Sequence, residues 1–570
     1  MSLEAKSNEL KQFVSIYESS WFLGHLSELI KNIASGRAEE ELKGLSSPLR
    51  QIYYLAGLNL TTAPDTGINK HLEEQDWERM VAMLIEIEYE YAKLFFPKED
   101  ETVDDNWKRV RSVAIPSFLS YFNQGPLNFE EQAINWVRDL YQPLSDIILA
   151  ETGLTVDDFI GFYENIDSLV QKNFQAYMTK DGGGPENWQR YARVEVGVDE
   201  DAPDFIKEMG EANRPLYTFL ADSGISQRFA PEDLVSDNLP LDKVTRIINY
   251  LYVSRHEADF LYYTATRPGN PLYETPLVDI GGGLYQVFEV KQVIHAIDLF
   301  FERVCSGTVE RSTRLIEKKG KLLEARIVNL FTTFFKKDYQ IFRSYYVDGC
   351  EQDILILWNK YAFIIEAKGY KLNEPFRDPN RAFVRIKSDF KSSIGYGFDQ
   401  VRRIQQKFVS KDPLVICDNT GKKIAEIDTS KYDGNDFGIV VNLKSFGQIQ
   451  VDLSTLLELS EDDVYPWVVR LDDLEVFLLT LIARKNGPKA FIDFLELREE
   501  LHGKLICADE LEVCGGYLNK KIDFKTIEKH DRIVTAPDLA DIFDEQYVKG
   551  MGFENEKYLA EKKGGKHHFW

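Results

Sequence analysis

The chain has 570 residues, and its 93 Asp and Glu against 68 Lys and Arg give a formal net charge of −25. This acidic balance argues against a protein that coats nucleic acid over its whole surface. The length predicts about three domains. A hydrophobic content of 44% with 13% aromatic residues is typical of a folded globular chain and not of a disordered one.

The sequence also argues against a membrane or secreted protein. No run approaches the roughly 18 apolar residues of a membrane span, and the start Met-Ser-Leu-Glu-Ala-Lys lacks a secretory pattern. The cysteines show no Cys-x-x-Cys motif and no His partners at zinc spacing. We therefore expect a cytoplasmic protein, with no membrane partner, whose thiols stay reduced: Cys305, Cys350, Cys417, Cys507 and Cys514.

Residues 1–270 predict a mostly helical domain. Apolar residues recur every three to four positions over residues 13–30, 77–95, 129–149 and 241–263, which is the pattern of amphipathic helices. This half carries no catalytic motif. We expect it to regulate, to position a substrate, or to bind a protein partner or a second copy of the chain through its acidic surface.

Residues 271–310 are expected to connect this domain to the next. Residues 277–288 indicate two short strands around a glycine turn, and residues 290–305 a helix. A second helical pattern over residues 321–331 places Glu324 on one face with Ile327, Val328 and Phe331. An acid at the edge of this apolar face either points into a site or reaches water.

A β-hairpin is predicted next, with apolar strands at residues 354–358 and 361–365 joined by Asn359-Lys360. A two-residue turn there places Asp353 opposite Glu366, and Glu351 opposite Lys368. Like charges that face each other across strands are destabilising, so two facing carboxylates predict a bound cation, Mg²⁺ or Mn²⁺. The alternative is a hairpin whose charged end is simply solvated.

Asp353 followed by Glu366-Ala367-Lys368 resembles the signature of the PD-(D/E)XK nuclease superfamily, closest to its Mrr-like and nuclease-related branches. Gln352 stands where the motif has its proline. The resemblance covers residues 315–410 and implies a restriction-endonuclease-like α/β core, a central mixed sheet flanked by helices, over residues 311–460. The sequence pattern after it predicts a helical C-terminal extension and tail over residues 461–570.

This resemblance implies a metal-dependent endonuclease that hydrolyses DNA phosphodiester bonds, with RNA as the other substrate left open. Defence against foreign DNA is a further implication by analogy of fold. The metal would be held by Glu324, Asp353, Glu366 and the carbonyl of Ala367. Lys368 would act on the attacking water, and Gln400, on the inner face of a helical pattern over residues 398–408, would steady Lys368 or the water.

The charge pattern supplies a separate indication. Residues 311–410 hold 20 Lys and Arg against 11 Asp and Glu, a basic segment in an acidic chain that is typical of a polyanion site. We expect sequence-independent contacts to phosphates from Lys371, Arg381, Arg385, Lys387, Lys391, Arg402, Arg403 and Lys407.

Beyond this segment, residues 413–417, 422–427, 437–443 and 467–471 predict strands that extend the same sheet, followed by helices over residues 472–484 and 488–501. An alternative function stays open at this point. The same fold serves as a catalytically silent nucleic-acid-binding module or as a scaffold for protein interactions.

Overall fold

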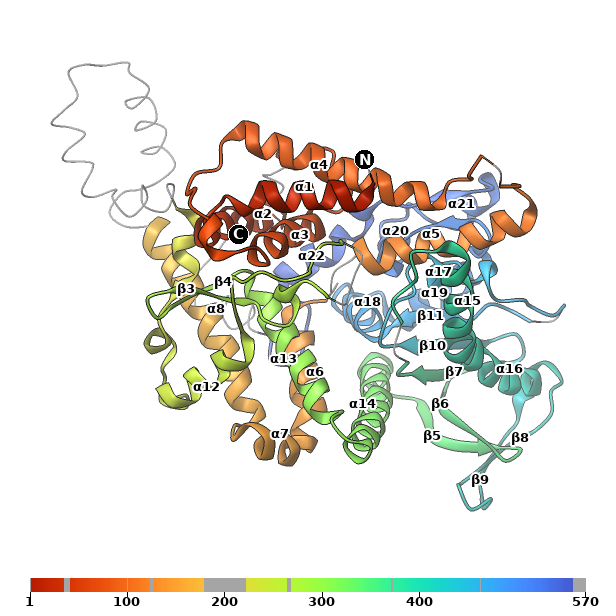
Figure 1. The fold of residues 1–570 in the computed structure, drawn as a ribbon. Helices are drawn as coiled ribbons and strands as arrows, with labels where there is room; N and C mark the ends of the chain where they lie inside the picture. The colour runs from red at the N-terminus through yellow and green to blue at the C-terminus, as the bar shows by residue number, and fades with distance from the viewer. Residues whose placement is uncertain are drawn as a thin grey trace, which may run out of the picture. The chain divides into compact units, whose positions relative to one another are not determined.

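The computed structural model describes residues 2–34, 41–99, 101–123, 128–178, 222–263, 268–370, 373–461 and 463–556. They form two compact units (Figure 1), Met1–Lys93 with Trp136–Arg311 and Leu94–Asn135 with Ser312–Phe569. The chain is therefore multidomain. Residues 94–135, which the sequence assigned to the helical N-terminal domain, belong to the second unit. No helix in the described ranges has the length and apolar character needed to cross a membrane.

The first unit is mostly helical and includes a small sheet of strand order β1-β4-β3-β2. Its strands are β1 (Arg228–Phe229), β2 (Tyr252–Ser254), β3 (Leu277–Gly281) and β4 (Leu284–Val287). Its helices are α1 (Leu3–Ser15), α2 (Ser19–Ala34), α3 (Pro48–Leu60), α4 (Glu74–Ala92), the end of α6 (Glu130–Tyr141), α7 (Ser145–Thr152), α8 (Val156–Met178), α12 (Leu241–Leu251) and α13 (Val290–Cys305).

The predicted hairpin over residues 277–288 and the helix over residues 290–305 are confirmed by β3, β4 and α13. The turn between β3 and β4 requires glycine, because Gly281, Gly282 and Gly283 all have positive φ, at 84°, 65° and 81°.

Three predicted helices of this half are wrong in their extent. Residues 13–30 form the two helices α1 and α2, because the chain turns at Tyr17, which bridges to Asn69. The helix predicted over residues 129–149 is interrupted by Pro143, whose ring removes a backbone donor. The helix predicted over residues 241–263 ends at Leu251, because β2 follows at once and pairs in parallel with β3.

The second unit is built on a mixed sheet of strand order β11-β10-β7-β6-β5-β8-β9. Its strands are β5 (Tyr339–Val347), β6 (Cys350–Trp358), β7 (Tyr361–Lys368), β8 (Leu414–Cys417), β9 (Lys423–Ile427), β10 (Asp436–Asn442) and β11 (Trp467–Arg470). Strands β5, β6 and β7 form an antiparallel meander, while β10 runs parallel to β7 and β11 parallel to β10. The prediction that the later strands extend the hairpin's sheet is confirmed.

Helices cover both faces of this sheet. On one face Phe363 of β7 packs against Phe331 and Phe335 of α14 (Val309–Phe335) and Phe491 of α19 (Gly487–Glu500). Side chains alternate along a strand, so Glu366 and Lys368 lie on the opposite face. That face is covered by α16 (Tyr396–Val409), which contacts both β7 and β10.

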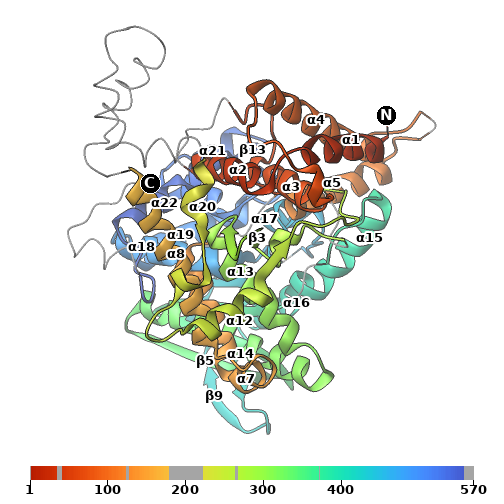
Figure 2. The same ribbon diagram turned by 60° about the vertical axis from the view of Figure 1, so that its left-hand side comes forward.

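Helix α16 continues from α15 (Pro379–Phe390) through a π-helical turn at Lys391–Gly395. Helix α5 (Asp105–Asn123) packs along α15, as Figures 1 and 2 both show. Arg111 of α5 donates to Asn380 Oδ1 at 3.4 Å. The segment of residues 94–135 therefore supports the helix that leads to the inner face of the sheet.

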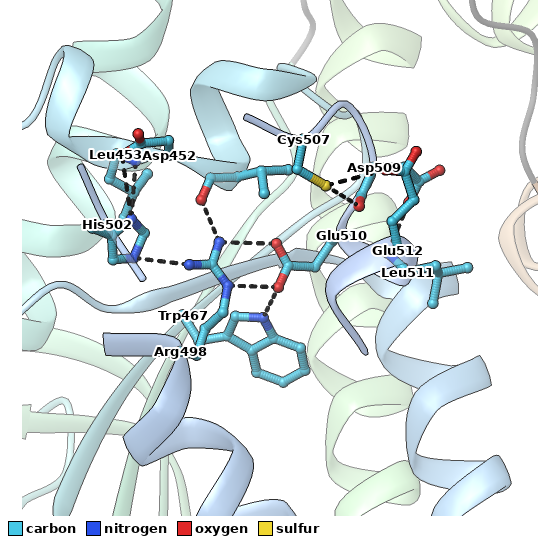
Figure 3. Close-up of polar contacts among 11 residues, drawn as sticks. Asp452, Leu453, Trp467, Arg498, His502, Cys507, Asp509, Glu510, Leu511 and Glu512 are labelled. Atoms are coloured by element: carbon cyan, nitrogen blue, oxygen red, sulfur yellow. Dashed lines mark hydrogen bonds and ion pairs between the residues drawn. The ribbon is translucent and has the colours of Figure 1, made fainter. Parts of the chain in front are cut away.

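The C-terminal part of the second unit is fixed by a buried charge cluster (Figure 3). Arg498 of α19 donates to both carboxylate oxygens of Glu510, at 2.8 and 3.0 Å, and each side chain is only 1% exposed. Trp467 of β11 donates its indole N–H to Glu510 at 2.8 Å. The cluster joins β11, the edge strand of the mixed sheet, to α19 and to α20 (Glu510–Leu518). The other elements of this region are α17 (Gln448–Val451), α18 (Leu471–Ala483), β12 (Leu505–Ile506), α21 (Phe524–Lys529), β13 (Ile533–Val534) and α22 (Asp541–Lys549).

Candidate active site

The hairpin turn lies where the sequence predicts it. Trp358 pairs with Tyr361, and the register continues through Leu355↔Ile364 to Ile354↔Ile365. Asn359 takes a positive φ of 53°, which Asn tolerates better than most residues. Beyond Ile354 the two strands no longer pair with each other, while β6 stays paired with β5 and β7 with β10. The expected facing pairs therefore lie just past the end of the β6–β7 ladder, where the two strands separate.

Three of the predicted residues come together at this end of the hairpin. Lys368 Nζ lies 2.9 Å from Glu366 Oε2 and 3.4 Å from Asp353 Oδ2. The amide of Ala367 donates to Asp353 Oδ2 at 2.8 Å, and the amide of Asp353 donates to Glu366 Oε1 at 3.2 Å. Each carboxylate is thus held by the backbone of the opposite strand, and the ammonium lies between them.

The three side chains of this cluster are largely buried. The side chain of Glu366 is 1% exposed, that of Lys368 12% and that of Asp353 19%. Burial, and next the charge of Asp353, raise the pKa of Glu366 to about 8. Burial alone would lower the pKa of Lys368, but the charges of Glu366 and Asp353 outweigh it and raise that pKa above its ordinary value. Lys368 therefore stays protonated.

Glu324 reaches toward the same end of the sheet from α14. Its Oε2 accepts a hydrogen bond from Ser344 Oγ at 3.3 Å. Burial raises the pKa of Glu324, and the negative charge of Asp353 raises it further. Glu324 is thus electrostatically coupled to the cluster, and in the described chain it makes no hydrogen bond to Lys368 or Glu366.

A hard divalent cation fits these donors. Mg²⁺ and Mn²⁺ prefer carboxylate and carbonyl oxygens, and such a cation would offset the charge of Asp353 that, after burial, raises the pKa of Glu366. Asp353 and Glu366 are the two carboxylates in position to bind it. In the described ranges, no group of three or more His, Cys, Asp and Glu side chains is arranged as a metal site.

Gln400 lies on α16 as predicted, but in the described part of the chain it makes no hydrogen bond to Lys368. Its Nε2 donates to the carbonyl of Glu351 at 3.4 Å. Its Oε1 is buried and has no partner in the part of the chain that the structure describes, and the same holds for Tyr345 Oη, Gln352 Oε1 and Asn442 Oδ1. Buried polar atoms are nearly always hydrogen-bonded, so this end of the sheet suits water or a polar ligand.

Two residues that the sequence reasoning missed also contact Lys368. The ring of Tyr396 lies 5.5 Å from the Lys368 ammonium, within the range of a cation–π interaction. A Cβ on Gly397 would lie 3.1 Å from Lys368 Cε and 3.0 Å from Val440 Cγ1. A glycine inside a helical pattern is a signal of close approach, and Gly397 carried that signal.

The predicted phosphate contacts differ in how available they are. Arg402 pairs with Asp463 at 2.8 Å and Lys407 with Asp348 at 2.9 Å, so these two cations already have acidic partners. Lys371 lies outside the described residues. Arg381, Lys387 and Lys391 are exposed, while Arg385 and Arg403 are half-buried.

No protein-family model, curated protein or solved structure matches the chain. Its function is therefore inferred from the chemistry of the site.

Proposed function

We propose that this chain is a metal-dependent nuclease of the restriction-endonuclease-like fold that hydrolyses phosphodiester bonds in DNA. The observation that carries the proposal is the buried cluster of Asp353, Glu366 and Lys368 at the end of the β6–β7 hairpin. Two acids and one protonated lysine at a single point are what metal-assisted phosphodiester hydrolysis requires.

The order of elements around the site supports the same proposal. Helix α14 precedes the β5–β6–β7 meander, and α15 and α16 lead to β10, which runs parallel to β7. This is a mixed sheet between helices, as the resemblance of the motif to PD-(D/E)XK nucleases implies. A role in defence against foreign DNA rests on analogy of fold alone.

Each residue has a distinct role in this mechanism. Asp353 and Glu366 would hold Mg²⁺, helped by the carbonyl of Ala367 and by Glu324. When bound there, the ion would polarise a phosphoryl oxygen and lower the pKa of water. Lys368, kept protonated by its neighbours, orients the attacking water and stabilises the negative charge that develops on the phosphate. Gln400 anchors α16 to β6 through the Glu351 carbonyl and thereby holds the helix that covers Lys368.

A plasmid-cleavage assay tests the proposal. Supercoiled and linear DNA are incubated with the wild-type chain and with Asp353→Asn, Glu366→Gln and Lys368→Met, in Mg²⁺ and in EDTA. Each substitution should lower cleavage by at least roughly a hundredfold, while Lys360→Met in the hairpin turn serves as the matched lysine control. Wild-type rates for two of the three site variants would show that the site is assigned wrongly.

A further inference from the structure

A groove of about 610 Å³ runs along α15 in the second unit. Its lining residues are Phe376, Asn380, Arg381, Val384, Arg385, Ser388 and Asp389. Those from α15 recur at three-to-four spacing, so they belong to one face of that helix. The volume is in the range of ligand sites, and Val384 is 68% exposed, so the groove is open to an incoming molecule.

Two guanidinium groups are fixed in this groove by one aromatic ring. The guanidinium carbons of Arg381 and Arg385 lie 4.3 and 4.2 Å from the centre of the Phe376 ring. Arg385 also donates to the carbonyl of Glu374 at 3.0 Å. Stacked guanidiniums lose little further freedom when they bind, and their planar N–H edges match phosphate oxygens.

The exposed charge of the groove is positive. Asp389 is the only acid that lines it in the described chain, and it is 5% exposed. Its carboxylate accepts hydrogen bonds from Tyr370 Oη at 2.7 Å and from Asn373 Nδ2 at 3.0 Å. Tyr370 follows Lys368 by two residues, so these bonds tie the groove wall to the end of the strand that carries the candidate active site.

We propose that this groove binds the sugar-phosphate backbone of the nucleic-acid strand that enters the candidate active site. Arg381 and Arg385 contact its phosphates, and Phe376 holds both guanidiniums in place. The inference rests on the proposed nuclease function and adds a defined path for the substrate. Because the contacts are to phosphates, binding is independent of base sequence and sensitive to salt.

Fluorescence anisotropy with labelled single-stranded and duplex oligonucleotides in EDTA tests the groove without cleavage. In the full chain, Arg381→Gln and Arg385→Gln should each weaken binding about three- to tenfold at low salt and reduce the slope of log affinity against log salt by about one. Phe376→Leu keeps both charges, so it should weaken binding with the slope unchanged. Arg484→Gln, at the exposed end of α18, is the control.

Wild-type affinity in both arginine variants would overturn the inference, as would displacement of the oligonucleotide by polyglutamate and not by a second oligonucleotide. An unaltered affinity for Phe376→Leu would overturn the role of the ring. If binding depends on the two arginines but no DNA is cleaved, the proposed nuclease function is contradicted and the proposed role of the groove is retained. If DNA is cleaved but binding does not depend on the arginines, the nuclease function is retained and the role of the groove is contradicted.

Discussion

The carboxyl group of Glu366 couples the candidate site to pH. Its pKa is raised from an ordinary 4.5 to about 8 in the folded chain, by burial and by Asp353. The folded state therefore holds a proton that the unfolded state has lost between these two pH values, and stability falls as pH rises through this window. Below about pH 4.5 the stability that comes with the proton on Glu366 is fully present, and above about pH 8 it is lost.

Glu366→Gln cannot titrate, so it does not lose stability in this way. In EDTA the melting temperature of the variant minus that of wild type should therefore increase from pH 5 to pH 9. Each unit of pKa shift corresponds to about 1.4 kcal/mol. The melting temperatures of both chains across this range measure the effect. A difference that stays constant with pH would mean that Glu366 is not the buried titrating acid, and Glu426→Gln on exposed β9 is the control.

The substitution Gly397→Ala tests whether the position of Lys368 affects cleavage independently of the stability of the fold. The added methyl would lie 3.1 Å from Lys368 Cε, so we expect the ammonium to be displaced and cleavage to fall roughly ten- to hundredfold. Alanine favours a helix by about 1 kcal/mol over glycine, which offsets the local strain. Cleavage rate and melting temperature are measured together. A fall in cleavage that is accompanied by a clear fall in melting temperature would indicate that Gly397 has a packing role only.

At the scale of the elements, local sequence patterns predicted the helices and strands better than they predicted the contacts between them. The β6–β7 turn, strands β8 to β11 and helix α13 follow from apolar runs and turn residues in the sequence itself. Strand β5 was missed because most of its side chains are only half-buried or exposed, which leaves no apolar run. The position of Tyr396 and Gly397 against Lys368 depends on the π-helical turn and on the pairing of β7 with β10, and no local pattern encodes either.

The buried pair of Arg498 and Glu510 should dominate the stability of the C-terminal elements. Removing one partner leaves an unpaired charge in the interior, which costs about 3–5 kcal/mol. We therefore expect Arg498→Met and Glu510→Gln each to lower the free energy of unfolding by this order, as measured in urea. Lys411→Met breaks an exposed pair with Asp433 and should change little. Equal effects of the buried and exposed substitutions would contradict this account.

At the scale of the whole molecule, the second unit is discontinuous in sequence. Helix α5 contributes the buried residues Val110, Val113 and Phe118 and packs along α15. A fragment of residues 312–569, the second segment of this unit, lacks this helix. We expect it to be poorly soluble alone and to become soluble when residues 94–135 are co-expressed. A fragment that folds fully by itself, as judged by circular dichroism and melting, would contradict the assignment of α5 to this unit.

The rate of plasmid cleavage as a function of Mg²⁺ concentration at pH 7, 8 and 9 tests the metal-dependent site most directly. A proton on Glu366 competes with the cation, so the Mg²⁺ needed for half-maximal cleavage should fall as pH rises through about 8. Glu366→Gln should not cleave at any of these pH values. Cleavage in EDTA, or cleavage by Glu366→Gln at the wild-type rate, would contradict a metal-dependent site at Asp353, Glu366 and Lys368.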